Sequence, residues 1–206
     1  MSLPSSKSSQ SFGWLLLGGL FAAAPLHGAA GQPVPLPTAP ACTGQARPTP
    51  AQTEGPYYKA NAPRRHSLVS KGQAGERIVL TGFVLTRNCR PVAGAVVDVW
   101  QADARGAYDN AGFNLRGHEL TDAQGRYWFE TVVPAQYPGR TPHIHVKVQA
   151  PGQRVLTTQL YLPNEQRNAR DGIFNPALVM TLQQANGTRG EEPLLVGRYD
   201  FVLDAP

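Results

Sequence analysis

The chain has 206 residues, a formal net charge of +5 at pH 7 and hydrophobic residues at 41% of its positions, which is enough for one domain with a core of its own. Its arginines are scattered, apart from the pair Arg64-Arg65, so the clustered basic face of a nucleic-acid binder is not indicated. We therefore expect no nucleic-acid partner, and we interpret the excess of positive charge as a solvated surface with a bias towards small anions.

The first thirty residues have the order of a secretory signal peptide. A single charge at Lys7 is followed by an apolar run from Trp14 to Ala24 and by small residues at 28–30. The apolar run is short and broken by glycines, which argues against a membrane span, although an uncleaved anchor is the alternative. Residues 1–30 thus predict export to the periplasm or the extracellular space, with no membrane span in the mature form.

Residues 31–52 are rich in proline, alanine, glycine and threonine, and predict an extended arm outside the core. The arm contains Cys42, and the one other cysteine of the sequence is Cys89. An oxidising compartment favours a disulfide between them, which would attach the arm to the first pair of strands; two unpaired thiols are the alternative. The oligomeric state is left open, and a homo-oligomer in which the arm crosses to a neighbour is compatible with the sequence.

Residues 53–206 form the predicted domain, in which short β-rich runs alternate with turns. Strands are expected at 78–85, 95–100, 126–132, 143–149, 155–161 and 198–203. Strands of this length and spacing, with no long amphipathic helix, predict an all-β protein with a β-sandwich and long loops. Residues 164–185 contain either a short helical segment or a long loop, and their pattern does not decide between the two.

The strand expected at 143–149 contains a pair of histidines. His143 and His145 are two residues apart and therefore project from one face, whereas Ile144 and Val146 project from the other face towards the core. A turn rich in proline and glycine precedes the pair, with Tyr137 at its far end. Imidazole is a common metal ligand. A polar outer face is the alternative for an isolated pair, but the phenol and the rigid turn favour a metal centre.

The other ligands that are available decide which metal this predicted centre would bind. Two imidazoles alone suit copper or zinc, so a copper or zinc protein that uses only His143 and His145 is one interpretation. Phenolate oxygens suit a hard, highly charged cation such as Fe(III), which can deprotonate a phenol that otherwise titrates near pH 10. Besides Tyr137, a second phenol is available at Tyr108, in a Gly-Ala-Tyr-Asp turn.

With these residues, the chain resembles a known family, the intradiol ring-cleavage dioxygenases of the catechol and protocatechuate type. The matching motifs lie in the order of the family, between Thr53 and Gln159. They are Thr53-Glu-Gly-Pro-Tyr-Tyr58, Arg90-Pro-Val-Ala-Gly-Ala-Val-Val-Asp-Val-Trp100, Gly106-Ala-Tyr108, Phe113-Asn-Leu-Arg116, Thr121-Asp-Ala-Gln-Gly-Arg-Tyr127, Val133-Pro134 to Tyr137, Arg140-Thr-Pro-His-Ile-His145 and Thr157-Thr-Gln159. The resemblance covers about half of the chain.

The resemblance implies a non-haem Fe(III) enzyme that cleaves a catechol-type ring between its two hydroxylated carbons with O₂, giving a muconate-type diacid. The implied iron ligands are Tyr108, Tyr137, His143 and His145. Arg140 and Gln159 would line the substrate site, and Pro56-Tyr57-Tyr58 would form one wall of it. The implied partners are a small catechol-type substrate and O₂.

Two departures from the family pattern matter. Gln101 follows Trp100 where many relatives have histidine, which should alter hydrogen bonding around the ligands rather than ligation itself. The connection from Tyr137 to His143 is short, which suggests a compact subfamily, so the identity of the substrate is not transferred. Arg64 and Arg65 would favour a carboxylated catechol, and His66 and His118 are expected outside the metal centre.

A non-enzymatic interpretation rests on two of the same segments. Residues 91–99 and 121–129 also resemble the transthyretin-like (prealbumin-like) or carboxypeptidase-regulatory β-sandwich, a common secreted binding module. Such a pattern encodes a fold, and the fold does not fix the function. This alternative gives no purpose to the two tyrosines and two histidines.

Overall fold

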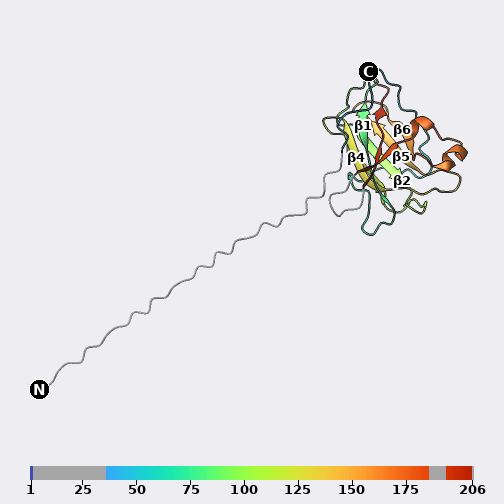
Figure 1. The fold of residues 1–206 in the computed structure, drawn as a ribbon. Coiled ribbons are helices and arrows are strands. Elements are labelled where there is room, and N and C mark those ends of the chain that lie inside the picture. The colour runs from blue at the N-terminus through green and yellow to red at the C-terminus, as the bar shows by residue number, and fades with distance from the viewer. Residues whose placement is uncertain (2–35, 186–193, 206) are drawn as a thin grey trace. The chain divides into compact units, whose positions relative to one another are not determined.

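The computed structural model describes residues 1, 36–185 and 194–205. Two β-sheets make up the domain (Figure 1). One sheet has the strand order β4-β1-β8-β7, with β9 also paired to β1, and the other has the order β3-β2-β5-β6. The strands are β1 (Arg77–Leu85), β2 (Val96–Gln101), β3 (Arg116–Leu120), β4 (Arg126–Val132), β5 (His143–Gln149), β6 (Leu156–Tyr161), β7 (Thr181–Ala185), β8 (Leu194–Arg198) and β9 (Phe201–Val202). The predicted all-β class and β-sandwich are confirmed.

The core lies between the two sheets and is built from the alternate residues of each strand. In β5, Ile144, Val146 and Val148 are fully buried in it, as their alternation predicts. Residues of β1, β4 and β9 supply the opposite side, among them Leu80 and Phe129. Because these three residues of β5 point into the core, the histidines of β5 lie on its opposite face.

Five strands lie where the sequence predicts them, to within one residue: β1, β2, β4, β5 and β6. The strand expected at 198–203 is broken instead into the end of β8 and β9. The break lies opposite Gly82, where β1 changes its parallel partner from β8 to β9. A side chain on Gly82 would meet the Tyr199 carbonyl oxygen at 1.8 Å, so the close approach there requires glycine.

The undecided segment 164–185 contains short helical turns and a strand. Two 3-10 helices, η1 (Gln166–Arg170) and η2 (Pro176–Leu178), are followed by β7. Each helix begins after a residue whose side chain accepts a backbone N–H, Glu165 for η1 and Asn175 for η2. The part of the chain that the structure describes contains no helix long and apolar enough to cross a membrane.

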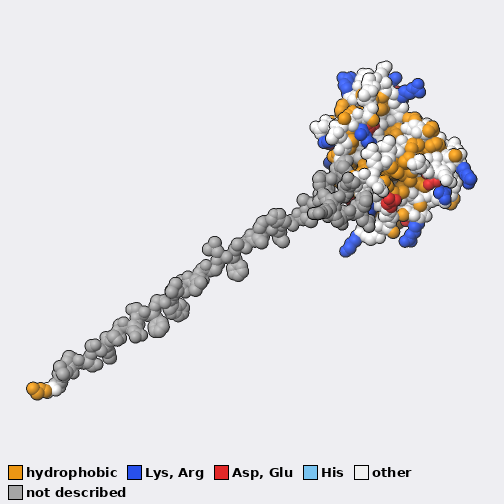
Figure 2. All heavy atoms as spheres, viewed as in Figure 1, with side chains coloured by type: hydrophobic (Ala, Val, Ile, Leu, Met, Phe, Trp, Pro, Cys, Tyr) orange, Lys and Arg blue, Asp and Glu red, His pale blue; other side chains and the backbone are white. Residues whose placement is uncertain are grey.

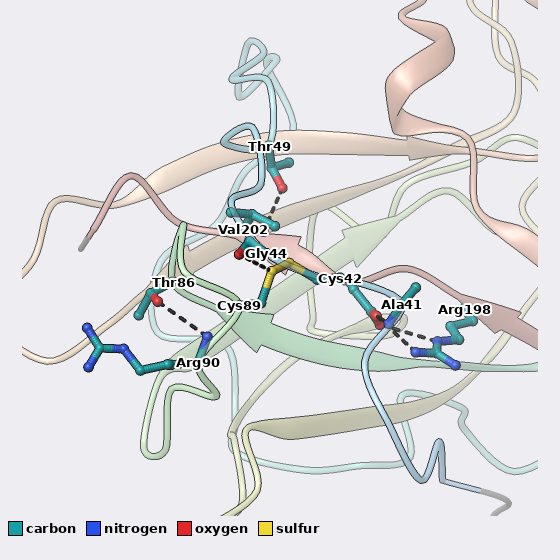
Figure 3. The surroundings of a disulfide bond; sticks show 10 residues. Ala41, Cys42, Gly44, Thr49, Thr86, Cys89, Arg90, Arg198 and Val202 are labelled. Carbon is teal, nitrogen blue, oxygen red and sulfur yellow. Dashed lines mark hydrogen bonds and ion pairs between the residues drawn. A yellow bond between two sulfur atoms is a disulfide. The ribbon is translucent and has the colours of Figure 1, made fainter.

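The arm is attached to the domain by a disulfide (Figure 3). Cys42 and Cys89 are bonded with their Cα atoms 5.6 Å apart, so the predicted pairing is confirmed. Beyond the bond, the backbone N–H of Thr49 donates to Val202 and that of Gln52 donates to Thr157. The arm therefore reaches the edge of β6, next to the histidine pair on β5. The predicted signal peptide and the first part of the arm lie outside the described residues.

On the face seen in Figure 2, lysine and arginine side chains are spread around the margin rather than gathered in one patch. The adjacent arginines Arg64 and Arg65 both form bonds within the domain. Arg64 pairs with Glu119 at 2.9 Å, and Arg65 donates to the backbone carbonyls of Phe113 and Arg116. Neither side chain is among the residues that line the cavity described below, and the assignment of this pair to a substrate carboxylate stays a prediction.

Candidate metal centre

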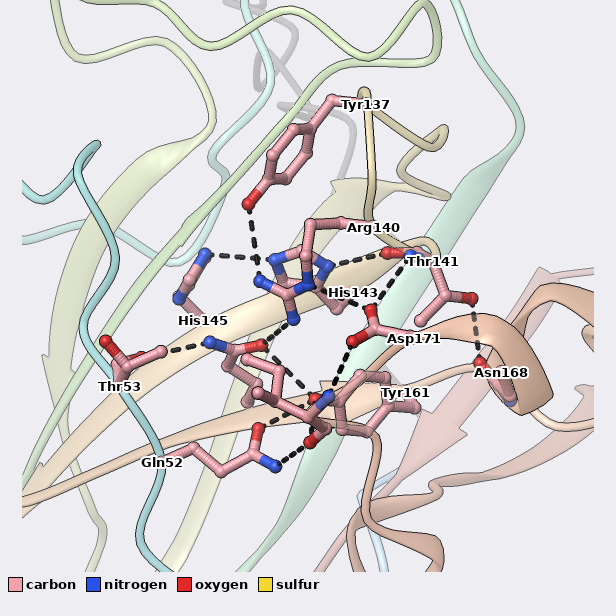
Figure 4. Close-up of polar contacts among 12 residues, drawn as sticks. Gln52, Thr53, Tyr137, Arg140, Thr141, His143, His145, Tyr161, Asn168 and Asp171 are labelled. Atoms are coloured by element: carbon pink, nitrogen blue, oxygen red, sulfur yellow. Dashed lines mark hydrogen bonds and ion pairs between the residues drawn. The ribbon is translucent and has the colours of Figure 1, made fainter.

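The histidine pair lies on the face of β5 that points away from the core, yet both side chains are buried. His143 and His145 are 2% and 1% exposed, and their Nε2 atoms are 3.1 Å apart (Figure 4). The Nδ1 atom of His143 lies 2.7 Å from the Thr141 carbonyl oxygen. A carbonyl oxygen can only accept a hydrogen bond, so Nδ1 carries the hydrogen and Nε2 presents its lone pair.

His145 is held by its neighbours in the sheet. It is paired with Trp100 of β2 on one side and with Gln159 of β6 on the other. The Trp100 ring stacks on the imidazole at 4.8 Å between centroids with an interplanar angle of 7°. The two ring nitrogens of the histidine pair are therefore directed to one point by their strand and by packing.

Two tyrosines from separate loops close around this point. The Tyr137 ring centroid lies 5.5 Å from that of His143, and the Tyr108 centroid lies 6.2 Å from that of His145. The two phenol rings are 5.6 Å apart. The structure thus brings together all four residues that the sequence analysis nominates as ligands.

The loop before Tyr108 packs directly against the loop before Tyr137. Gly106 has φ +84°, and a side chain there would meet the Gln136 carbonyl oxygen at 2.1 Å. Because only glycine combines that φ with so close an approach, Gly106 sets the distance between the two loops. The predicted Gly-x-Tyr turn therefore has a defined structural role.

The predicted wall Pro56-Tyr57-Tyr58 is divided between two places. Tyr57 stacks on Tyr108 at 4.4 Å and meets Tyr137 edge-on at 5.8 Å, so it lines the centre. Tyr58 instead donates its hydroxyl to Asp98 at 3.2 Å. Tyr58 therefore does not compete for a ligand role.

Arg140 connects the Tyr137 turn to β6 (Figure 4). Its Nη1 donates to the Tyr137 hydroxyl oxygen at 3.3 Å, and its Nη2 donates to Gln159 Oε1 at 2.6 Å. Gln159 in turn donates Nε2 to the Thr53 carbonyl at 2.9 Å. Both residues expected beside the substrate thus lie next to the phenol and imidazole groups.

Burial dominates the electrostatics of this centre. Desolvation lowers the pKa of His143 to about 4 and that of His145 well below its ordinary value. Both imidazoles are therefore neutral near pH 7, as metal ligands must be. Desolvation and the neighbouring Tyr137 raise the pKa of the Tyr108 phenol, although Arg140 and Arg116 oppose the shift. That phenol ionises near neutral pH only if a cation replaces its proton.

These side chains fit a metal ion of high charge. The buried hydroxyl of Tyr108 has no hydrogen-bond partner among the described residues, which is costly unless a ligand is expected there. The same part of the chain holds no group of three or more His, Cys, Asp and Glu side chains suited to a metal. The donor set at this centre is thus two neutral imidazoles and two phenols, which suits a hard trivalent cation.

Sequence reasoning assigned no role to two charged residues at this centre. Arg116 of β3 is 1% exposed, donates to the Tyr57 and Asp109 carbonyls, and lies 5.8 Å from the centroid of the Tyr108 ring. Asp171 accepts from Arg140 Nε at 2.9 Å. Arg116 lies within a family motif, which was the available signal, whereas nothing in the sequence distinguishes Asp171.

Three other residues lie apart from the four ligand candidates. Gln101 bonds across to β4, where it donates to the Val132 carbonyl at 2.8 Å and accepts from Thr131 at 2.9 Å. His118 contacts the Ala62 carbonyl at 2.8 Å, and His66 stacks on Trp128 at 4.2 Å between centroids. The two histidines are thus outside the centre, as expected.

A cavity of about 420 Å³ adjoins the centre through Tyr137 and Arg140. An apolar cavity of about 150 Å³ is enough to hold benzene, so a single aromatic ring fits. Further residues of the lining come from the Tyr137 turn and from η1, namely Gln136, Pro138, Gly139, Thr141, Arg167, Arg170 and Asp171.

The fold matches that of known dioxygenases. A family model described as dioxygenase matches residues 53–205. The dioxygenase domain of a dioxygenase carbohydrate-binding protein fusion from Streptomyces sp. SirexAA-E superposes with a TM-score of 0.72 at 50% identity, covering 78% of this chain and 100% of that one. The 3-chlorocatechol 1,2-dioxygenase of Rhodococcus opacus 1CP gives a TM-score of 0.69 at 26% identity, covering 76% of this chain and 72% of that one.

Curated relatives agree with the structural comparison. Catechol 1,2-dioxygenase 2 of Acinetobacter lwoffii is 35% identical over 173 residues, 68% of this chain and 63% of that protein. Hydroxyquinol 1,2-dioxygenase of Rhizobium sp. (strain MTP-10005) is 34% identical over 146 residues, 58% of this chain and 50% of that protein. The match thus spans one half to just under two thirds of these relatives. The chain belongs to the intradiol ring-cleavage dioxygenase family.

Proposed function

We propose that this protein is an Fe(III) enzyme that cleaves a catechol-type ring between its two hydroxylated carbons with O₂. The observation that carries the proposal is the convergence of His143, His145, Tyr108 and Tyr137 on one buried point, with the Tyr108 hydroxyl left without a partner among the described residues. Family membership supports the reaction class, since the family generally depends on non-haem iron.

The four side chains would hold the iron, and each is prepared for that task. The imidazoles are neutral, and the Thr141 carbonyl orients His143 so that its Nε2 lone pair faces inward. Fe(III) held by these residues would supply a Lewis acid that makes a catechol ring reactive towards O₂. The Tyr108 or Tyr137 phenolate could also accept a proton from the catechol.

The chain supplies further groups beside the metal. Arg140 directs two N–H donors to Tyr137 and Gln159, which suits it to stabilise negative charge that develops on the ring and its oxygens. Tyr57, stacked on Tyr108, gives an aromatic wall that excludes water from that side. Both atoms of O₂ enter the product, which is a muconate-type diacid, so no external reductant is needed.

Oxygen uptake with a panel of catechols tests the proposal, with the metal-free protein as control. We expect uptake only from the iron-loaded protein, a reddish colour from tyrosinate-to-iron charge transfer, and a diacid that contains both atoms of labelled O₂. No uptake with any diphenol would overturn the enzymatic assignment and favour the colourless binding module. Incorporation of a single labelled atom would exclude a dioxygenase.

We further propose that the enzyme acts after export. The N-terminal pattern of residues 1–30 supports this, and so does the Cys42–Cys89 bond, because disulfides persist in oxidising compartments. Fractionation of cells that express the full chain, with mass spectrometry of the mature N-terminus, tests it. Recovery of the intact chain in the cytosol would contradict it.

A further inference from the structure

The carboxylate of Asp171 is almost completely enclosed beside the proposed iron centre. Its side chain is 1% exposed, and it follows directly after η1. One oxygen, Oδ2, accepts from Arg140 Nε at 2.9 Å and from the backbone N–H of Thr141 at 3.0 Å. The other oxygen, Oδ1, accepts from the backbone N–H of Ile173 at 3.1 Å. The two bonds to Oδ2 join the turn after η1 to the segment between Tyr137 and His143, whereas the bond to Oδ1 lies within that turn.

A further bond joins the same two segments without involving Asp171 or Arg140. The Thr141 hydroxyl donates to Asn168 Oδ1 at 2.8 Å (Figure 4). Asn168 also donates Nδ2 to the Leu162 carbonyl at 3.0 Å. The general attachment of η1 to the Tyr137 turn can therefore be separated experimentally from the contact between Asp171 and Arg140.

The contact with Asp171 determines how the Arg140 guanidinium lies. A guanidinium is planar, and its donors form a rigid fork. When Asp171 holds the Nε edge, the planar group directs Nη1 to the Tyr137 hydroxyl and Nη2 to Gln159. Of the three acceptors only Asp171 is ionised, and a bond between two ionised groups is stronger than one to a neutral acceptor, so the carboxylate is the strongest of the three restraints on Arg140.

Without the carboxylate, the Arg140 side chain has space to move. Its side chain is 16% exposed and borders the cavity of about 420 Å³. The cavity is also lined by Arg167 and Arg170, but neither cation would attract the guanidinium. Loss of the anion would therefore free the fork to rotate towards water in the cavity.

We propose that Asp171 is a positioning residue, which holds the Arg140 guanidinium so that its two terminal nitrogens face Tyr137 and Gln159. The inference rests on the function proposed above. Asp171 does not touch the reacting atoms in this arrangement, and it acts only through Arg140. Its removal should therefore reduce the stabilisation of charge in the transition state and leave the binding of the catechol largely intact.

Asp171→Asn is the direct test, because it removes the charge and keeps the size of the side chain. We expect kcat to fall by about 10–100-fold with little change in KM, the size of effect typical when a group that orients a metal-site residue is lost. Asn168→Ala is the matched control, since it removes the bond between η1 and the Thr141 hydroxyl, which does not involve Asp171. Its kcat should stay close to that of the unmodified protein. An equal loss in both variants would mean that Asp171 only supports the loop.

A double-mutant cycle with Arg140→Gln distinguishes positioning from an independent role. If Asp171 acts through Arg140, Asp171→Asn causes no further loss of kcat in the Arg140→Gln background. Multiplicative losses would overturn the inference. If Asp171→Asn does not fold, Asp171→Glu takes its place, because it keeps the charge and displaces it by one methylene; its smaller loss should also vanish in that background.

A readout that needs neither iron nor turnover completes the test. In the metal-free protein, the Nε–H NMR signal of Arg140 should exchange slowly with solvent, and it should exchange rapidly in Asp171→Asn but not in Asn168→Ala. Unchanged slow exchange in Asp171→Asn would overturn the inference. If the unmodified iron-loaded protein oxidises no catechol, the proposed function fails by itself. If it is active and Asp171→Asn matches it, only the positioning role fails.

Discussion

The Gln136 carbonyl oxygen lies where a side chain of Gly106 would be, 2.1 Å from the ideal Cβ position. This approach brings the loop that contains Tyr108 against the loop that contains Tyr137, whose rings are 5.6 Å apart. The two phenols belong to separate loops of the chain. Their distance from each other therefore depends on a single residue that has no side chain.

Gly106→Ala should consequently disrupt the metal centre. Relief of the clash requires the Tyr108 loop to move away, so we expect loss of bound iron and of the visible band, with a loss of stability of about 1–3 kcal/mol. Gly152→Ala is the control, because Gly152 has φ +70° and nothing within 4 Å of its Cβ position. It carries similar backbone strain without a clash. Equal iron content in both variants would contradict the expectation.

Tyr108→Phe should weaken and shift the visible band of the iron-loaded protein, because Tyr137 remains as the other phenolate. The change deletes a single oxygen, and the ring can still stack on Tyr57 at 4.4 Å. We expect iron affinity to fall by at least the roughly 10–100-fold that loss of an outer partner costs. Absorption spectroscopy and metal analysis measure both effects, with Tyr57→Phe as the control that keeps its colour. An unchanged spectrum in Tyr108→Phe would show that Tyr108 is not an iron ligand.

The stability of the metal-free protein should decrease in acid. Burial holds the pKa of His143 at about 4 in the folded state, below its ordinary value of 6.5. Between these values the unfolded chain binds a proton that the folded protein does not, so stability decreases as the pH falls from 6.5 to 4. The shift corresponds to a loss on the order of 3 kcal/mol. Urea unfolding across this range measures it, and His143→Gln should make the profile shallower, with the remaining slope due to the buried His145. A profile that is already flat in the unmodified protein would contradict the buried, neutral histidine.

The disulfide should contribute to stability without affecting the metal centre. Cys42 and Cys89 are 47 residues apart, and closing a loop of that length in the unfolded chain is worth about 4 kcal/mol in the chain-entropy model, with about 2–4 kcal/mol usual in practice. Reduction should lower the free energy of unfolding by that amount while the folded, iron-loaded protein keeps its colour. The double variant Cys42→Ser, Cys89→Ser should not respond to reductant. A loss of colour on reduction at temperatures where the protein stays folded would show that the arm supports the centre.

Parts of the centre could be predicted because they depend on short-range geometry. His143 and His145 share a face of β5 whatever the rest of the chain does, and the alternation with Ile144 fixes which face is polar. The burial of that polar face could not be predicted from β5. It results from Trp100 on the neighbouring strand and from the covering segment that contains Tyr57, which are remote in the sequence.

Other elements are not evident from the sequence because their local pattern is weak. The β3 sequence Arg-Gly-His-Glu-Leu has little apolar alternation, and β3 is held by backbone bonds to β2 and to the segment around Arg65. Asp171 lies between two short 3-10 helices, where periodicity gives no guidance. Its role depends on a contact with Arg140 across 31 residues. Contacts of this kind follow from tertiary packing.

The parallel pairing around Gly82 has a consequence for how the chain becomes folded. Val84 of β1 is paired with Phe201, and Ile78 is paired with Leu195, so an early strand needs partners from the last residues of the sequence. Contacts between residues so far apart in the sequence form slowly, so β1 gains its neighbour on that side late in folding. The sandwich is therefore closed by contacts of high sequence separation rather than by neighbouring hairpins.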